Sequence, residues 1–205
     1  MNPAEAELAA ERIRSGRIVA YPTETFYGLG TDALSSPAVE NLFILKGREP
    51  GKPIPVLVSD REMLEKIAVR IGRRAEILIQ NFWPGPLTLI FPARKTLPAN
   101  LTAGTGKIGA RISSHPVALQ ICRRFGGPIT TTSANPEGQA PSRSAVQVRR
   151  YFPAVLDLIL EAGRLSGKKG STVLDLTCHP AVLVREGEIP REELEVFLPI
   201  KSRKS

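Results

Sequence analysis

RIVAYPTETFYGLG, residues 17–30, joins a strand pattern to a proline and two glycines. Its first five residues, RIVAY, predict a short strand, and Pro22 ends it because proline has no amide hydrogen to donate to a neighbouring strand. Gly28 and Gly30 lack a Cβ atom, so the backbone can approach another group closely there. The segment therefore marks one side of a ligand site, unless its apolar and aromatic residues serve the core.

Outward from this segment, helical and extended patterns alternate along the chain. Apolar spacing and end signals predict helices over residues 3–15, 36–46 (capped by Ser36 and ended by Gly47), 60–81 with an interruption at Gly72, 115–125, and from 142 or 144 to 151. Strand patterns cover residues 54–58, 87–91, 107–112, 128–132, 155–160, 171–176 and 181–185. This mixture lacks Rossmann alternation and internal repeats, which predicts an α/β fold with a mixed sheet.

Length and composition fit one compact domain. The chain has 205 residues, of which 42% are hydrophobic and 23% charged, so it can bury a core without disulfide bonds. Its two cysteines and two histidines do not stand at zinc-ligand spacing. We expect one domain over residues 1–198, followed by a basic tail over residues 199–205.

The charge balance predicts an anionic partner. Lysine and arginine number 28 against 20 acidic residues, a formal net charge of +8, which suits a nucleic acid, nucleotide phosphates or an anionic surface. No stretch approaches the ~20 apolar residues of a membrane span, and the N-terminus lacks the apolar region of a signal peptide. We therefore expect a cytoplasmic protein without a membrane partner.

Several familiar motifs are incomplete. The GTGKIG of residues 104–109 matches a dinucleotide fingerprint in letters, but a strand pattern follows it where a helix is required. Neither Gly-Lys pair is followed by Ser or Thr, which excludes a P-loop. The order of the SxN and SxxK elements excludes an acyl-serine enzyme, and neither histidine fits a Ser-His-Asp triad.

Two loops carry the strongest signals. KGREPGK, residues 46–52, places three cations within seven residues past a helix end. These cations could bind a triphosphate. Alternatively, the segment is a solvated turn in which Lys46 complements the helix dipole. TTTSANP, residues 130–136, can point hydroxyls and amides at a ligand or form a hydroxyl-capped turn. Further polar residues lie in strand patterns: Arg111, Ser171, Thr172 and Arg185. Their combination with the loops favours one shared site.

These motifs resemble those of the YrdC-like family, the L-threonylcarbamoyladenylate synthases, over almost the whole chain. The matching residues are PTET at 22–25, YGLG at 27–30, Lys46 and Arg48 as KxR, Lys52, SAN at 133–135, STV at 171–173 and Arg185. The resemblance implies an open twisted mixed β-sheet with flanking helices around a concave, positively charged cavity. It also implies the short, single-domain form, since longer relatives carry a further C-terminal domain.

The implied activity is a nucleotidyl transfer in which L-threonine, bicarbonate and ATP give threonylcarbamoyl-AMP and pyrophosphate, for the modification of adenosine 37 in tRNA. The resemblance implies threonine contacts at Thr25, Arg111, Ser133 and Ser171. It implies ATP contacts at Arg48, Lys52, Lys107, Asn135, Arg143 and Arg185, and catalytic roles for Lys46, Arg48, Ser133 and Asn135. Leu57 and Lys107 depart from the family pattern, which often has histidine and a small hydroxyl residue at those places.

This chemistry needs no general base. Threonine's amine and bicarbonate give an ionised carbamate that can attack the α-phosphorus, so the protein has to orient two substrates and neutralise charge. Mg²⁺ is expected with ATP, held by phosphate oxygens and water, with Glu24 and Asp32 at most contacting its water ligands. A threonylcarbamoyl transferase acting on tRNA is the expected recipient of the product.

Two other functions stay open. An RNA-binding module without catalysis would use the net charge and the cations Lys201, Arg203 and Lys204 on tRNA or double-stranded RNA, although such binding favours diffuse cations and exposed aromatics over compact loops. The other is a YrdC-like paralogue with a different acyl acceptor or carbamoyl donor, although the KxR and SAN motifs are intact.

Overall fold

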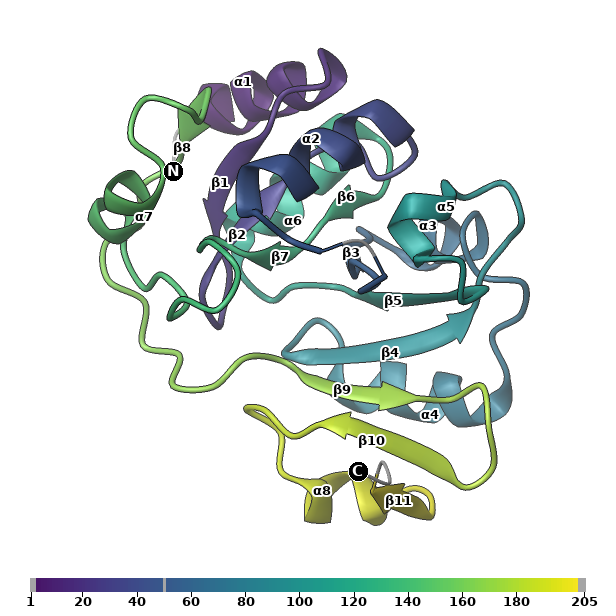
Figure 1. Ribbon diagram of the computed structural model, residues 1–205. Coiled ribbons are helices and arrows are strands. Elements are labelled where there is room, and N and C mark those ends of the chain that lie inside the picture. Colours follow the sequence, from purple (N-terminus) through teal and green to yellow (C-terminus); the bar gives the residue numbers. More distant parts are fainter. Residues whose placement is uncertain (1–2, 50, 203–205) are drawn as a thin grey trace.

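The structure of the protein is a computed structural model that describes residues 3–49 and 51–202. Figure 1 shows two β-sheets with helices packed around them. The smaller sheet has the strand order β7-β2-β1-β8. Its strands are β1 Val19–Pro22, β2 Tyr27–Gly30, β7 Thr132–Ser133 and β8 Leu158–Ile159.

The larger sheet has the order β11-β10-β9-β4-β5-β3-β6 and is mixed. Its strands are β3 Val56–Leu57, β4 Leu87–Pro92, β5 Lys107–Arg111, β6 Ile129–Thr130, β9 Thr172–Asp175, β10 Ala181–Arg185 and β11 Ile200–Ser202. β4 pairs antiparallel with β5 and parallel with β9, while β10 pairs antiparallel with β9 and parallel with β11. The predicted α/β class with mixed pairing is confirmed, although the hydrogen bonds divide the strands between two sheets.

Helices lie against these sheets along the whole described chain. They are α1 Pro3–Arg14, α2 Ser36–Lys46, α3 Arg61–Glu65, α4 Arg73–Phe82, α5 Ala99–Thr102, α6 Pro116–Phe125, α7 Ala145–Tyr151 and α8 Arg191–Glu195. α1 and α6 pack on each other and on β1. Neither α5 nor α8 was predicted from the sequence, because helices this short carry little apolar periodicity. Within residues 3–49 and 51–202, no helix is both long and apolar enough to cross a membrane.

The helix ends follow local signals. Ser35, rather than the predicted Ser36, caps α2: its side chain accepts from the amide of Ala38, and Ser36 is the first residue of the helix. Gly47 ends α2 with a φ of 57°, a left-handed conformation that glycine adopts without steric cost. The predicted interruption between α3 and α4 is confirmed, but it covers residues 66–72, because α3 already ends at Glu65 and α4 begins at Arg73, directly after Gly72.

The glycines of β2 make room for a buried ring. A Cβ atom on Gly30 would lie 2.6 Å from the Tyr21 ring, and one on Gly28 would lie 3.3 Å from it. Tyr21 is fully buried, and its hydroxyl donates to the Thr130 carbonyl at 2.8 Å. The close approach predicted at these glycines is therefore to a side chain of the neighbouring strand β1, which runs on through Pro22 instead of ending before it.

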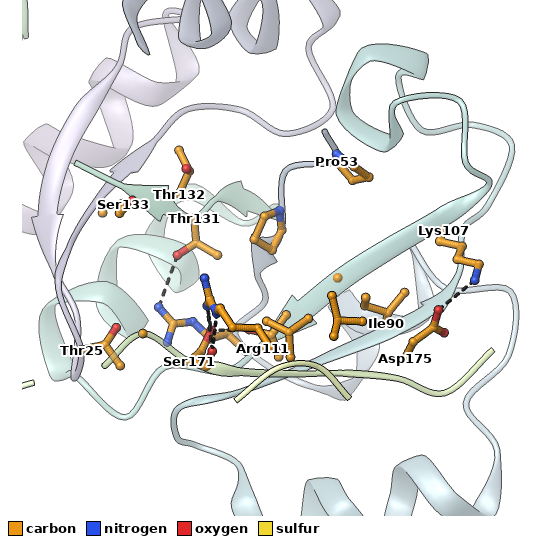
Figure 2. A pocket seen from close by; sticks show the side chains of 18 of the residues that line it. Thr25, Pro53, Ile90, Lys107, Arg111, Thr131, Thr132, Ser133, Ser171 and Asp175 are labelled. Carbon is orange, nitrogen blue, oxygen red and sulfur yellow. Dashed lines mark hydrogen bonds and ion pairs between the residues drawn. The ribbon is translucent and has the colours of Figure 1, made fainter. Parts of the chain in front are cut away.

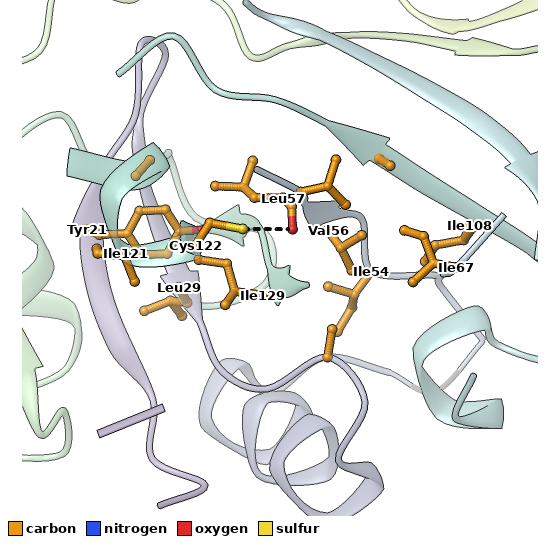
Figure 3. Close-up of a cluster of buried hydrophobic side chains, with 14 of the residues drawn as sticks. Tyr21, Leu29, Ile54, Val56, Leu57, Ile67, Ile108, Ile121, Cys122 and Ile129 are labelled. Atoms are coloured by element: carbon orange, nitrogen blue, oxygen red, sulfur yellow. Dashed lines mark hydrogen bonds between the residues drawn. The ribbon is translucent and has the colours of Figure 1, made fainter. Parts of the chain in front are cut away.

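The core joins both sheets and helix α6. Figure 3 shows the buried side chains of Tyr21, Leu29, Ile54, Val56, Leu57, Ile121, Cys122 and Ile129 in one cluster. The Cys122 thiol donates to the Leu57 carbonyl at 3.5 Å, and burial raises its pKa to about 12. The Leu57 side chain is 1% exposed, so it belongs to the core at the place where the YrdC-like pattern often has histidine.

The C-terminal residues continue the larger sheet. Ile200 of β11 pairs with Ala181 of β10 and is buried. The folded chain therefore extends past residue 198, where the sequence analysis ended the domain, because one buried residue in a three-residue strand leaves almost no pattern. Lys201 of the predicted tail is exposed in β11, whereas residues 203–205 lie outside the described residues.

Candidate active site

A cavity of about 820 Å³ is walled by strands of both sheets. β2 and β7 of the smaller sheet and β4, β5, β9 and β10 of the larger sheet contribute residues to it. The predicted site residues that line it are Thr25, Arg48, Lys107, Arg111, Ser133, Ser171 and Arg185. The other predicted site residues, all of them described, lie outside its lining: Lys46, Lys52, Asn135 and Arg143.

Arg111 is held at one end of the cavity by an ion pair with Glu24. The two side chains are 6% and 14% exposed. Nη2 of Arg111 lies 3.5 Å from the Thr131 hydroxyl, and its buried Nε has no partner among the described residues. Ser113 donates to the second carboxylate oxygen of Glu24. Glu24 is thus engaged on both oxygens, which fixes the Arg111 guanidinium at this end of the cavity.

Hydroxyl groups surround this end. Arg185 donates to the Ser171 carbonyl from Nε at 3.1 Å and from Nη2 at 2.7 Å. The Ser171 hydroxyl lies 2.9 Å from that of Thr88, and the Thr25 hydroxyl lies 3.0 Å from that of Thr23. Figure 2 shows Thr25, Ser171 and Arg111 on the same side of the cavity. The strands therefore gather guanidinium and hydroxyl groups that can bind a small polar ligand.

Lys107 and Asp175 form the opposite end of the cavity (Figure 2). Lys107 Nζ lies 2.8 Å from Asp175 Oδ2, and the pair crosses β4, which separates β5 from β9. Burial by itself would raise the pKa of Asp175, but hydrogen bonds from Lys107 and Thr177 lower it below its ordinary value. A ligand anion at this end would compete with Asp175 for the Lys107 ammonium.

Lys46 forms hydrogen bonds to the backbone of the turn at residues 133–135, the SAN turn. It ends α2 and is 3% exposed, and its ammonium donates to the carbonyl oxygens of Ser133 and Asn135. Burial lowers its pKa to about 8, and the nearby charge of Arg48 adds to this. Lys46, predicted as part of a phosphate clamp, therefore contacts the backbone that carries Ser133 instead of facing the cavity.

Arg48 is the cation of KGREPGK that lines the cavity. Its Nη2 donates to the carbonyl oxygens of Lys52 at 3.3 Å and Pro53 at 3.1 Å. Its buried Nε has no partner within the described part of the chain, and burial lowers its pKa. The Lys52 ammonium instead pairs with Glu137. The three cations thus do not converge on one point, because each has a different partner.

Asn135 and Arg143 stabilise loops beside the cavity. Asn135 is 6% exposed, and its amide donates to two carbonyl oxygens of its own turn at 2.8 Å each. Arg143 donates to the carbonyl oxygens of Leu165 at 3.1 Å and Ser166 at 3.3 Å. The donors of both side chains are thus directed at backbone carbonyls, whereas the buried Asn135 Oδ1 has no partner among the described residues.

Thr88 and Asp175 were not predicted as site residues from the sequence, and Glu24 was predicted only as a contact of magnesium's water ligands. Thr88 is 1% exposed in the apolar strand β4, and a buried hydroxyl between apolar residues was an available signal. Asp175 ends the apolar strand β9, where a carboxylate is also unusual. No such signal existed for the Glu24–Arg111 pair, because the two residues lie 87 positions apart.

The cavity walls carry more positive than negative side chains. The charged lining residues among those described are Arg48, Lys107, Arg111, Arg185 and Asp175. Burial lowers the pKa of Arg185, but a guanidinium stays charged at neutral pH. A cavity of this size with clustered cations and hydroxyls can bind a small anionic or polar ligand.

Comparison with known proteins identifies the family. The chain belongs to the Sua5/YciO/YrdC family, since the model of that family, described as "Telomere recombination", matches residues 11–187. The chain is similar to a protein of Pyrococcus abyssi named threonylcarbamoyl-AMP synthase, with 40% identity over 188 residues, 92% of this chain and 55% of the relative. A protein of the same name from Halorhodospira halophila is 36% identical over 170 residues, 83% of this chain and 88% of the relative.

Solved structures share the fold. The P. abyssi Sua5 structure complexed with L-threonine matches with a TM-score of 0.94 and 37% identity, over 98% of this chain and 60% of that chain. Escherichia coli YciO matches with a TM-score of 0.85 and 28% identity, over 96% of this chain and 94% of that chain. The chain thus spans little more than half of the P. abyssi protein but nearly all of YciO.

Proposed function

We propose that this chain is a threonylcarbamoyl-AMP synthase that makes threonylcarbamoyl-AMP and pyrophosphate from L-threonine, bicarbonate and ATP. The observation that carries the proposal is the fold match, at a TM-score of 0.94, to a Sua5 structure complexed with L-threonine. The relatives of that name, at 36% and 40% identity, support the same activity.

The threonine contacts proposed are Thr25, Arg111, Ser133 and Ser171, which line one cavity. Arg111 suits the substrate carboxylate because a guanidinium offers paired donors in a fixed plane. Its Nε has no partner among the described residues, and Glu24 holds the group in one orientation. The hydroxyls of the set suit the amine and hydroxyl of threonine.

The nucleotide contacts proposed are Arg48, Lys107 and Arg185, whose positive charges line the same cavity. Lys52, Asn135 and Arg143 are proposed contacts on the family resemblance. Lys52 would first have to leave Glu137, and Arg143 would have to leave the carbonyl oxygens of the 165–166 segment. Among the proposed catalytic residues, Arg48 and Ser133 line the cavity, whereas Lys46 and Asn135 form hydrogen bonds within the turn beside it.

The reaction balances without a protein base. Threonine's ammonium first releases a proton to solvent, and the neutral amine and bicarbonate then give the carbamate and water. A carbamate oxygen then bonds to the α-phosphorus, and the bond from this phosphorus to the bridging oxygen breaks to release pyrophosphate. Since the nucleophile is already an anion, the protein contributes orientation and positive charge.

Mg²⁺ is proposed as the companion of ATP, bound by phosphate oxygens and water. Asp175 is the carboxylate among the described lining residues, and Lys107 already holds one of its oxygens. The described residues contain no group of three His, Cys, Asp or Glu able to hold a metal. This donor set fits an ion that arrives with the nucleotide.

Pyrophosphate release by the purified protein tests the proposal. The protein is supplied with ATP, Mg²⁺, threonine and bicarbonate, and in separate reactions threonine or bicarbonate is omitted. The mass of the nucleotide product is measured by mass spectrometry. Release that needs both substrates, with the mass of threonylcarbamoyl-AMP, is the expected result. Release that does not need threonine would contradict the proposed substrate and favour a paralogue with another carbamoyl chemistry.

The wider context is proposed on the same basis. The product would pass to a threonylcarbamoyl transferase acting on adenosine 37 of tRNA in the cytoplasm. Direct binding of tRNA or double-stranded RNA rests on the net charge of +8 and on tail residues of which 203–205 lie outside the described chain. Salt-sensitive RNA binding without any pyrophosphate release would favour the noncatalytic module.

A further inference from the structure

Glu137 contacts the KGREPGK segment on both sides of Arg48. Its backbone amide donates to the Lys46 carbonyl at 2.9 Å, and one carboxylate oxygen accepts the backbone amide of Glu49 at 3.0 Å. The other carboxylate oxygen binds the Lys52 ammonium. The Glu137 side chain thus holds Glu49, directly after Arg48, and Lys52, three positions after Glu49.

The direction of Arg48 depends on the same contacts. Its Nη2 donates to the carbonyl of Lys52 at 3.3 Å, and Lys52 is itself tied to Glu137 through its side chain. Arg48 lines the cavity, whereas Glu137, a described residue, does not. Glu137 can therefore affect a ligand through the segment that carries Arg48.

The negative charge of Glu137 also offsets the positive charge of the KGREPGK segment. Lys46, Arg48 and Lys52 lie within seven residues, and like charges this close repel one another. Hydrogen bonds from Lys52 and from the Glu49 amide lower the pKa of Glu137, so its carboxylate is ionised at neutral pH. Glu137 thus supplies a negative charge beside this group of cations.

We propose that Glu137 is a positioning residue that directs Arg48 toward the incoming nucleotide. It holds the Glu49 amide, and it holds the Lys52 ammonium until that group leaves it for the nucleotide. It does not touch the substrate. The ligand assignment rests on the proposed function, whereas the positioning rests on hydrogen bonds of the protein alone. Two separate measurements can therefore test the two parts.

Hydrogen exchange tests the positioning without any activity. In Glu137→Ala, the amides in the peptide over residues 47–53 should exchange faster, while those of α2 keep their wild-type rates. Glu137→Gln should lie between the two, because its amide oxygen can still accept from Glu49 but carries no charge for Lys52. Glu161→Gln removes an exposed ion pair with Arg149 and should leave the peptide unchanged. Unchanged exchange at 47–53 in Glu137→Ala would overturn the proposal.

Kinetics test the consequence for the substrate. Glu137→Ala should raise the KM for ATP roughly tenfold, the scale of one hydrogen bond to a charged group, with less than about a twofold change in the KM for threonine. Glu137→Gln should recover part of the loss. Equal increases in both KM values would indicate a general structural effect and would overturn the proposal. A wild-type protein that makes no product would reject the proposed function, while the exchange result still decides the role of Glu137.

Discussion

Arg111 and Glu24 form a mostly buried ion pair that joins the two sheets beside the cavity. Arg111 ends β5 of the larger sheet, and Glu24 lies in the turn between β1 and β2 of the smaller one. Ser113 donates to the free side of the carboxylate. The pair therefore sets the orientation of Arg111 at the end of the cavity proposed for threonine.

Removing Glu24 should weaken both stability and threonine binding. Glu24→Ala leaves a buried guanidinium without its counter-charge, which should lower the free energy of unfolding by about 3 kcal/mol and raise the KM for threonine. Urea unfolding measures the first effect. Glu195→Ala removes the Arg191–Glu195 ion pair, which is more exposed than the Arg111–Glu24 pair. It should lower the free energy of unfolding by less than about 1 kcal/mol. Equal losses of unfolding free energy in the two variants would show that burial does not make the Arg111–Glu24 pair more important for stability.

Lys46 should contribute to both stability and activity, whereas Arg48 should contribute mainly to activity. Lys46→Met leaves the carbonyl oxygens of Ser133 and Asn135 without their donor, so it should lower the free energy of unfolding by about 2 kcal/mol as well as kcat. Arg48→Met should reduce kcat and ATP binding with less than about 1 kcal/mol of destabilisation, because its guanidinium is part-exposed. Pyrophosphate release and urea unfolding measure both. An intact rate in Arg48→Met would contradict its proposed role.

The titration of Lys46 should appear in stability and activity. Burial lowers its pKa to about 8 in the folded protein, against roughly 10.4 for a free lysine, so the unfolded chain binds more protons between these values. The free energy of unfolding of the wild type should therefore rise relative to Lys46→Met as the pH increases through this range.

Activity should change in the opposite direction. Above pH 8, Lys46 loses the charge with which it holds the SAN turn, so kcat should fall. Lys46→Arg should remove this basic limb from the pH profile, because a guanidinium does not titrate there. The same limb in both proteins would show that another group is responsible.

Gly30 should not tolerate a side chain. Gly30→Ala places a Cβ atom 2.6 Å from the buried Tyr21 ring, and overpacking of this kind lowers the free energy of unfolding by about 1–3 kcal/mol. Gly72→Ala is the matched control, because nothing lies within 4 Å of its added Cβ atom and its φ is −83°. Thermal unfolding of both variants checks the difference, and an unchanged melting temperature in Gly30→Ala would refute the packing argument.

Much of the fold followed from local pattern. The apolar periodicity of α2 and α6 and their terminal Gly47 and Gly126 predicted these helices closely. The runs at 87–91 and 107–112 likewise predicted β4 and β5. These elements are set by hydrogen bonds and side-chain spacing within a few residues, which a single sequence displays directly.

The candidate site was predictable in composition but not in arrangement. The motifs identified most of the cations and hydroxyls near the cavity, because ligand chemistry restricts residue type. They did not reveal that Lys46 faces the backbone of Ser133, 87 positions away, or that Lys52 pairs with Glu137. Those contacts depend on how distant loops meet.

The amino-acid sequence alone was sufficient for the α/β class, most helix boundaries and the family resemblance, since each rests on short-range pattern or residue identity. The folded chain was needed to divide the strands between two sheets, to place β11 in the larger sheet and to pair Arg111 with Glu24. The physical reason is that burial and ion pairing depend on which distant segments pack together, and that packing is a property of the whole chain.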